Sequence, residues 1–137
     1  KNSNQYLLSF LSSFSNASES DMLKSIKELD FGNIESGFLK SMLYKIHGDL
    51  LIDNSSFSEG IEKYQKALDV SDDSGTYSAL INYKIASAYM IEDKYVESKK
   101  YLDIAMICKV SEQAANLTRK MEILESRLGQ ALKQTSN

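Results

Sequence analysis

The chain has 137 residues, of which 42% are hydrophobic and 26% charged, which is enough for one domain with its own core. Its formal net charge of −3 comes from interspersed charges without a basic stripe, which argues against DNA or RNA as a partner. No apolar run approaches the roughly 20 residues that span a bilayer, so we expect no membrane span within this fragment.

Apolar residues recur at spacings of three and four along almost the whole chain, whereas the period-two alternation of strands is missing. Proline is absent and only six glycines occur. The pattern therefore predicts an all-α protein with about seven helices. In chain order, the expected ranges are about 3–14, 18–29, 34–51, 57–70, 77–91, 94–108 and 111–133.

Short polar clusters separate these helices and predict where the chain reverses. They lie at 15–18, 30–33, 53–56, 71–75 and 92–93. Because the connections are short, we expect neighbouring helices to pair as antiparallel hairpins. The first helix is apolar around much of its circumference, which favours burial on several sides or a role in an interface.

Two of the predicted hairpins align without a gap at a constant offset of 38 residues. In the first hairpin the aligned positions are Tyr44, Gly48, Leu51, Phe57, Gly60, Tyr64, Ala67 and Leu68. In the second hairpin they are Asn82, Ala86, Tyr89, Tyr95, Ser98, Leu102, Ala105 and Met106. The small residues among them predict close approach of the paired helices, with aromatic side chains filling the space between neighbours.

This alternation of small and aromatic residues resembles the tetratricopeptide repeat over about residues 41–108. The resemblance implies antiparallel hairpins stacked as a short α-solenoid within a single domain, residues 1–137. Its parts would be a capping hairpin at 1–33, repeats at 41–74 and 79–110, and a capping helix at 111–133. The offset of 38 exceeds the 34 residues of that family, and Tyr44 and Asn82 stand where it often has Trp.

In that family the first helix of each repeat lines a concave groove, and the matching positions here are mostly apolar. The resemblance assigns a partner-binding groove to Met42, Lys45, Asp49, Ile52, Leu80, Tyr83, Ser87 and Met90. Such a groove suits an amphipathic helix or an extended apolar peptide of another protein. The Lys and Asn positions with which some family members hold a terminal carboxylate are not matched.

No pattern of catalytic residues stands out, so we predict no enzyme, no cofactor and no metal. The only histidine, His47, is expected to pack in the core, and the only cysteine, Cys108, to be a buried structural thiol. Asp72 and Asp73 lack the glycine and the terminal glutamate of a calcium loop, so we expect a solvated loop there.

The function expected from these features is a non-enzymatic scaffold that binds a protein partner through the groove or the caps. Two alternatives stay open: a self-association module that forms a homodimer, and a recruitment domain of a larger protein whose catalytic part lies elsewhere. The chain begins KNSNQ, without an initiator methionine or a signal peptide, so we expect a piece of a longer protein that a preceding segment could tether. The sequence does not indicate a compartment.

Overall fold

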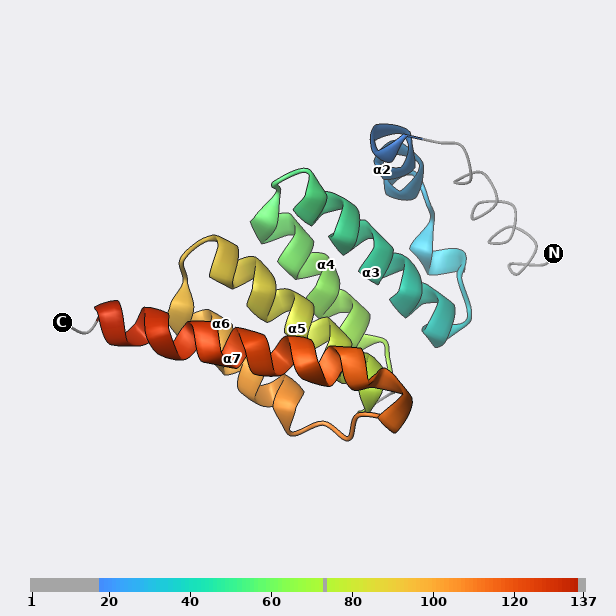
Figure 1. Ribbon diagram of the computed structural model, residues 1–137. Coiled ribbons are helices and arrows are strands. Elements are labelled where there is room, and N and C mark those ends of the chain that lie inside the picture. Colours follow the sequence, from blue (N-terminus) through green and yellow to red (C-terminus); the bar gives the residue numbers. More distant parts are fainter. Residues whose placement is uncertain (1–17, 73, 136–137) are drawn as a thin grey trace. The chain divides into compact units, whose positions relative to one another are not determined.

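The computed structural model describes residues 18–72 and 74–135, and the predicted helix at 3–14 lies outside this part (Figure 1). The described residues form an all-α fold without strands, as predicted. They contain six α-helices rather than about seven, and two short 3-10 helices. These are α2 (Glu19–Lys27), η1 (Phe31–Asn33), α3 (Gly37–Asp53), α4 (Phe57–Asp69), α5 (Thr76–Ile91), α6 (Tyr95–Met106), η2 (Glu112–Ala114) and α7 (Ala115–Thr135).

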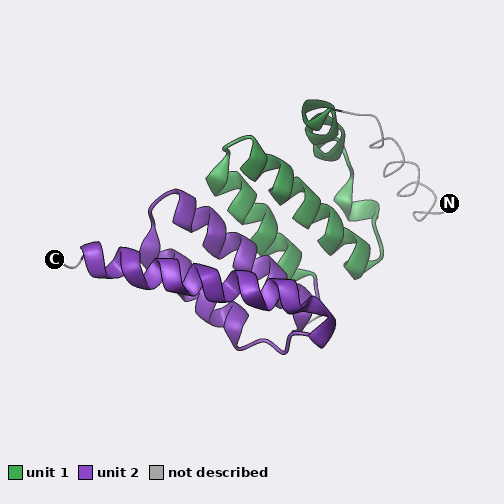
Figure 2. Cartoon of the chain, in the orientation of Figure 1, with its two compact units in different colours: residues 1–70 green, residues 71–137 purple. Residues whose placement is uncertain are grey.

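The chain divides into two compact units, residues 1–70 and residues 71–137 (Figure 2). Unit 1 holds α2, η1, α3 and α4, and unit 2 holds α5, α6, η2 and α7. The division falls at the polar loop that the sequence predicted between the second and third hairpins. Each unit contains one of the two hairpins that align at an offset of 38 residues.

In unit 1, α3 and α4 form an antiparallel hairpin, and α2 packs against α3. The buried cluster between α2 and α3 consists of Ile26, Leu29, Ile34, Leu43 and Leu50. Two helix starts are capped, because Ser18 Oγ accepts from the Asp21 N–H and Ser36 Oγ accepts from the Leu39 N–H, both at 3.2 Å. Such caps typically stabilise a helix by about 1 kcal/mol.

In unit 2, α5 and α6 form the second hairpin, and α7 packs against both of its helices. The buried cluster consists of Ala79, Ala86, Leu102, Ala105, Leu117, Met121, Leu124 and Leu128. Half of this cluster lies on α7 at spacings of four and three, which places one stripe of that helix against the hairpin. This stripe is the one that the sequence pattern predicted for 111–133.

The two hairpin turns have the same backbone geometry at the predicted offset. Ser55 and Asp93 both adopt the left-handed conformation, with φ of 64° and 61°. The next residue then closes the turn: the Ser56 N–H donates to the Leu51 carbonyl at 2.8 Å, and the Lys94 N–H donates to the Tyr89 carbonyl at 2.9 Å. This pattern satisfies carbonyls at the end of the first helix.

Small residues lie where the paired helices touch, as the alignment predicted. A Cβ atom added at Gly48 would lie 2.6 Å from the Tyr64 ring and 3.0 Å from the Gly60 carbonyl oxygen. The equivalent residues of the second hairpin, Ala86 and Ser98, are fully buried, and Ser98 Oγ donates to the Ala86 carbonyl at 2.7 Å. In both hairpins, small residues therefore let one helix approach the backbone of the other.

Candidate functional site

The eight predicted groove residues lie on α3 of unit 1 and α5 of unit 2, four on each helix, and all are half-buried. Those on α3 are mostly engaged within their own hairpin. Lys45 forms an ion pair with Asp49 at 3.1 Å, and Tyr64 of α4 donates its hydroxyl to Asp49 Oδ1 at 2.5 Å. Burial, and then this carboxylate, raise the pKa of Tyr64 far above its usual range, so the hydroxyl remains a donor.

Ile52 also faces its own hairpin. A Cβ atom added at Gly60 would lie 2.6 Å from Ile52 Cδ1, so this side chain covers the surface that the glycine leaves open on α4. Met42 is half-buried on the same helix. Asp49 and Ile52 thus contact α4 and help to hold the hairpin together, while Lys45 pairs with Asp49 along α3.

The four positions on α5 form a different surface, which we call the α5 strip: Leu80, Tyr83, Ser87 and Met90. Their spacings of three, four and three place them on one side of the helix. Leu80, Tyr83 and Met90 pack partly against the buried cluster of unit 2, while each keeps an accessible portion. The α5 strip is therefore an apolar surface anchored from behind by the unit 2 core.

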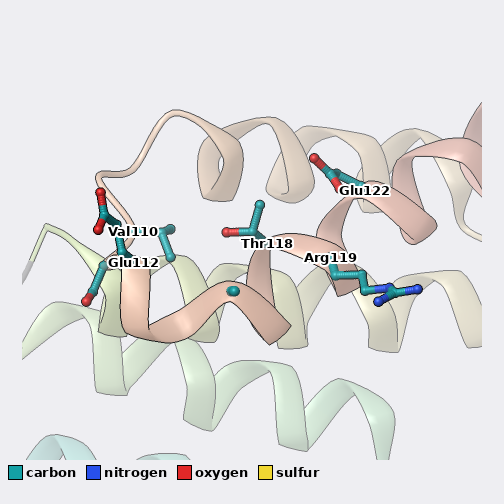
Figure 3. A pocket seen from close by; sticks show the side chains of 7 residues that line it. Val110, Glu112, Thr118, Arg119 and Glu122 are labelled. Carbon is teal, nitrogen blue, oxygen red and sulfur yellow. The ribbon is translucent and has the colours of Figure 1, made fainter.

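A shallow depression of about 600 Å³ lies beside the first turns of α7 (Figure 3). Its lining consists of Val110, Ser111, Glu112, Ala115, Thr118, Arg119 and Glu122. The charged ends of Arg119 and Glu122 point apart, so the depression does not gather polar groups around one point. The loop before α7 is tied to α5 by the Ser111 N–H, which donates to Thr76 Oγ1 at 2.7 Å. No sequence pattern predicted this depression.

The residues expected to be structural are found in packed positions. His47 is buried on α3. Cys108 was expected to be buried but is half-buried, because it lies just after the last turn of α6. It packs partly on the unit 2 cluster, and its thiol donates to the Ile104 carbonyl at 3.3 Å. Asp72 is exposed, and Asp73 lies outside the described residues.

Neither a metal site nor a membrane span is found among the described residues. Within 18–72 and 74–135, no group of three or more His, Cys, Asp or Glu side chains is placed to hold a metal ion. None of the helices in the same part of the chain has the length and apolar character needed to cross a membrane.

Comparison of the chain with protein-family models, with curated proteins and with solved structures found no match. The resemblance to the tetratricopeptide repeat therefore stays a prediction from the residues of the two hairpins.

Proposed function

We propose that this chain is a helical-repeat module of the tetratricopeptide kind that binds another protein and catalyses no reaction of its own. The equivalence of the two hairpins supports the repeat. Their turns share the left-handed residue and the closing hydrogen bond at an offset of 38, and their helices touch at small residues in equivalent positions. A repeated hairpin offers its first helix as a recurring surface for a partner.

The α5 strip is the observation that carries the binding proposal. Leu80, Tyr83 and Met90 form a row of apolar side chains that are accessible on one side and fixed to the core on the other. A pre-organised apolar row is complementary to the apolar stripe of an amphipathic helix, because both repeat at three and four residues. Little ordering of the α5 strip would be needed on binding, which favours affinity.

A direct test measures the binding of labelled amphipathic helical peptides to the full chain by fluorescence anisotropy. Ser87→Arg places a charge in the middle of the α5 strip and should weaken binding of the best peptide by about tenfold or more, which corresponds to about 1.4 kcal/mol. Ser126→Arg makes the same change at an exposed position of α7 and should leave binding unaltered. Equal affinities for both variants would exclude the α5 strip as the binding surface.

Self-association is a second candidate, favoured by apolar side chains exposed along α6. Val96 is 72% exposed and Ile107, just after the helix, is 83% exposed. Pairing of two copies would cover them. Sedimentation at several protein concentrations separates the candidates, because a dimer that is lost in a Val96→Lys/Ile107→Lys variant would favour self-association. A monomer at all concentrations would exclude self-association.

A further inference from the structure

Unit 1 contains a cavity of about 310 Å³ that is independent of the α5 strip in unit 2. Residues from α2, η1, α3 and α4 line it together with Leu29, which follows α2. The lining consists of Ile26, Lys27, Leu29, Phe31, Tyr44, His47, Glu59, Lys63 and Lys66. Apolar residues thus form part of its wall, while the charged groups come from two helices.

The charge of this cavity is positive, in contrast to the net charge of the chain. Lys63 and Lys66 follow Glu59 by one and two helical turns on the same face of α4, and Lys27 joins them from the last turn of α2. None of these three lysines forms an ion pair with another described residue. Three ammonium groups around one carboxylate leave the cavity with a surplus of cations.

His47 supplies a buried polar atom to the same cavity. Its side chain is only 6% exposed, and Nε2 has no hydrogen-bond partner within the described part of the chain. Leaving a buried polar group unpaired costs about 1 to 3 kcal/mol. Burial, followed by repulsion from Lys63, Lys27 and Lys66, lowers the pKa of His47 to about 4. An anion in the cavity would provide both the missing partner and the missing negative charge.

An aromatic wall completes the cavity. The rings of Phe31 and Tyr44 stack with their centroids 4.5 Å apart and their planes at 24°. Lys66 Nζ lies 5.9 Å from the centroid of the Tyr44 ring, so the cationic and aromatic parts of the lining adjoin each other. A flat group is able to pack beside such a pair while a charged substituent reaches the ammonium groups.

We propose that this cavity is a binding site for a small aromatic anion, a phosphate or carboxylate carried on a ring. The anionic oxygens accept hydrogen bonds from Lys63, Lys66 and protonated His47 Nε2, and the ring packs against the Phe31 and Tyr44 wall. Lys27 contributes attraction from α2, and Glu59 sets a preference for ligands whose charge lies toward the lysines. Binding is coupled to proton uptake by His47, because the anion stabilises the imidazolium.

The single histidine makes the test specific, since its ring gives one imidazole resonance set in an NMR spectrum of the full chain. The probes are phenyl phosphate and benzoate, with inorganic phosphate as the anion without a ring and phenol as the ring without a charge. We expect phenyl phosphate, benzoate or both to shift the His47 resonance saturably, to bind more tightly as the pH falls from 7 to 5, and to raise the pKa of His47 above about 4. The preferred probe identifies whether the ligand is a phosphate or a carboxylate.

Paired variants locate the site. Lys63→Gln/Lys66→Gln should weaken the preferred probe by about tenfold or more. Lys109→Gln/Lys120→Gln removes the same charge from exposed positions of unit 2 and should leave the affinity unchanged. The proposal is overturned if neither aromatic anion shifts the wild-type resonance at tens of millimolar, if phenol shifts it equally, or if both double variants lose the same affinity. The wild-type titration decides the question even if the cavity variant does not fold.

Discussion

The hairpin of α3 and α4 and the hairpin of α5 and α6 turn in the same way although their turns have no identical residue at any aligned position. Asp53–Phe57 reads DNSSF, whereas Ile91–Tyr95 reads IEDKY. Both turns place a non-glycine residue at a φ near 60°, which costs roughly 1 to 2 kcal/mol for an L-residue. The helix pairs on either side must therefore determine the turn, since the local sequence does not favour it in a common way.

The chemistry of the two hairpins differs most at the positions that line the unit 1 cavity. At the offset of 38, His47 corresponds to the fully buried Ile85, Lys63 to Tyr101, and Lys66 to Ile104. A buried isoleucine at the histidine position shows that the hairpin packs well without a polar group there. The histidine and the two lysines that the first hairpin contributes to the cavity thus have no counterpart in the second hairpin, whereas Glu59 corresponds to Glu97.

The largest expected effect tests whether both hairpins depend on the same close contact. Ala67→Leu and Ala105→Leu should each destabilise the chain by about 1 to 3 kcal/mol, because both alanines are fully buried between helices and an isobutyl group does not fit. Thermal or urea denaturation of the two variants measures the change. A large loss in one hairpin and none in the other would show that the equivalence does not extend to packing.

A smaller change in stability is expected at the positions where the paired helices touch, Gly48 in the first hairpin and Ala86 in the second. Gly48→Ala should destabilise by about 1 kcal/mol, because the clash with the Tyr64 ring and the Gly60 carbonyl outweighs the helix propensity gained. The reverse change at the equivalent position, Ala86→Gly, should cost a similar amount for the opposite reason, the loss of propensity. Urea denaturation measures the stability of both variants. A stabilising Gly48→Ala would mean that α3 and α4 pack less tightly at Gly48 than the structure indicates.

The hydroxyl of Ser98 should contribute about 0.5 to 1.5 kcal/mol through its buried hydrogen bond to the Ala86 carbonyl. Ser98→Ala removes the bond while it keeps the Cβ atom and the helix contact. Ser126→Ala, at an exposed position of α7, provides the control and should change stability by less than about 0.5 kcal/mol. Identical melting curves for the two variants would mean that the hydroxyl of Ser98 contributes no net stability.

The last comparison depends on pH and uses His47→Ile, which gives the first hairpin the residue of the second. Folded wild type holds the pKa of His47 at about 4 against an ordinary 6.5, so the unfolded chain binds more protons between these values. Wild type should therefore lose stability relative to the variant as the pH falls from 6.5 to about 4, and the two should run parallel above pH 7. Parallel curves throughout would show that His47 is solvated in the folded state.

The sequence by itself determined the helices, their connections and the small residues between them. Turn formers at 53–56 and 92–93 stop the apolar stripes, so α3 and α5 end at Asp53 and Ile91. These features are local, because spacing along a helix fixes which side chains share a face. The stripe on α7 was predictable for the same reason.

Only the tertiary structure decided what the polar side chains of unit 1 do. The groove predicted to include Lys45, Asp49 and Ile52 stays a prediction, and the structure adds that Lys45 pairs with Asp49, Tyr64 donates to that carboxylate, and Ile52 covers Gly60. The cavity was not predicted, although the spacing of Lys63 and Lys66 on one face of α4 was a visible signal. Its cations lie more than thirty residues apart in sequence, from Lys27 to Lys63, and packing of α2 on the hairpin brings them together. A period along one helix carries no information about which face of another helix will be its neighbour.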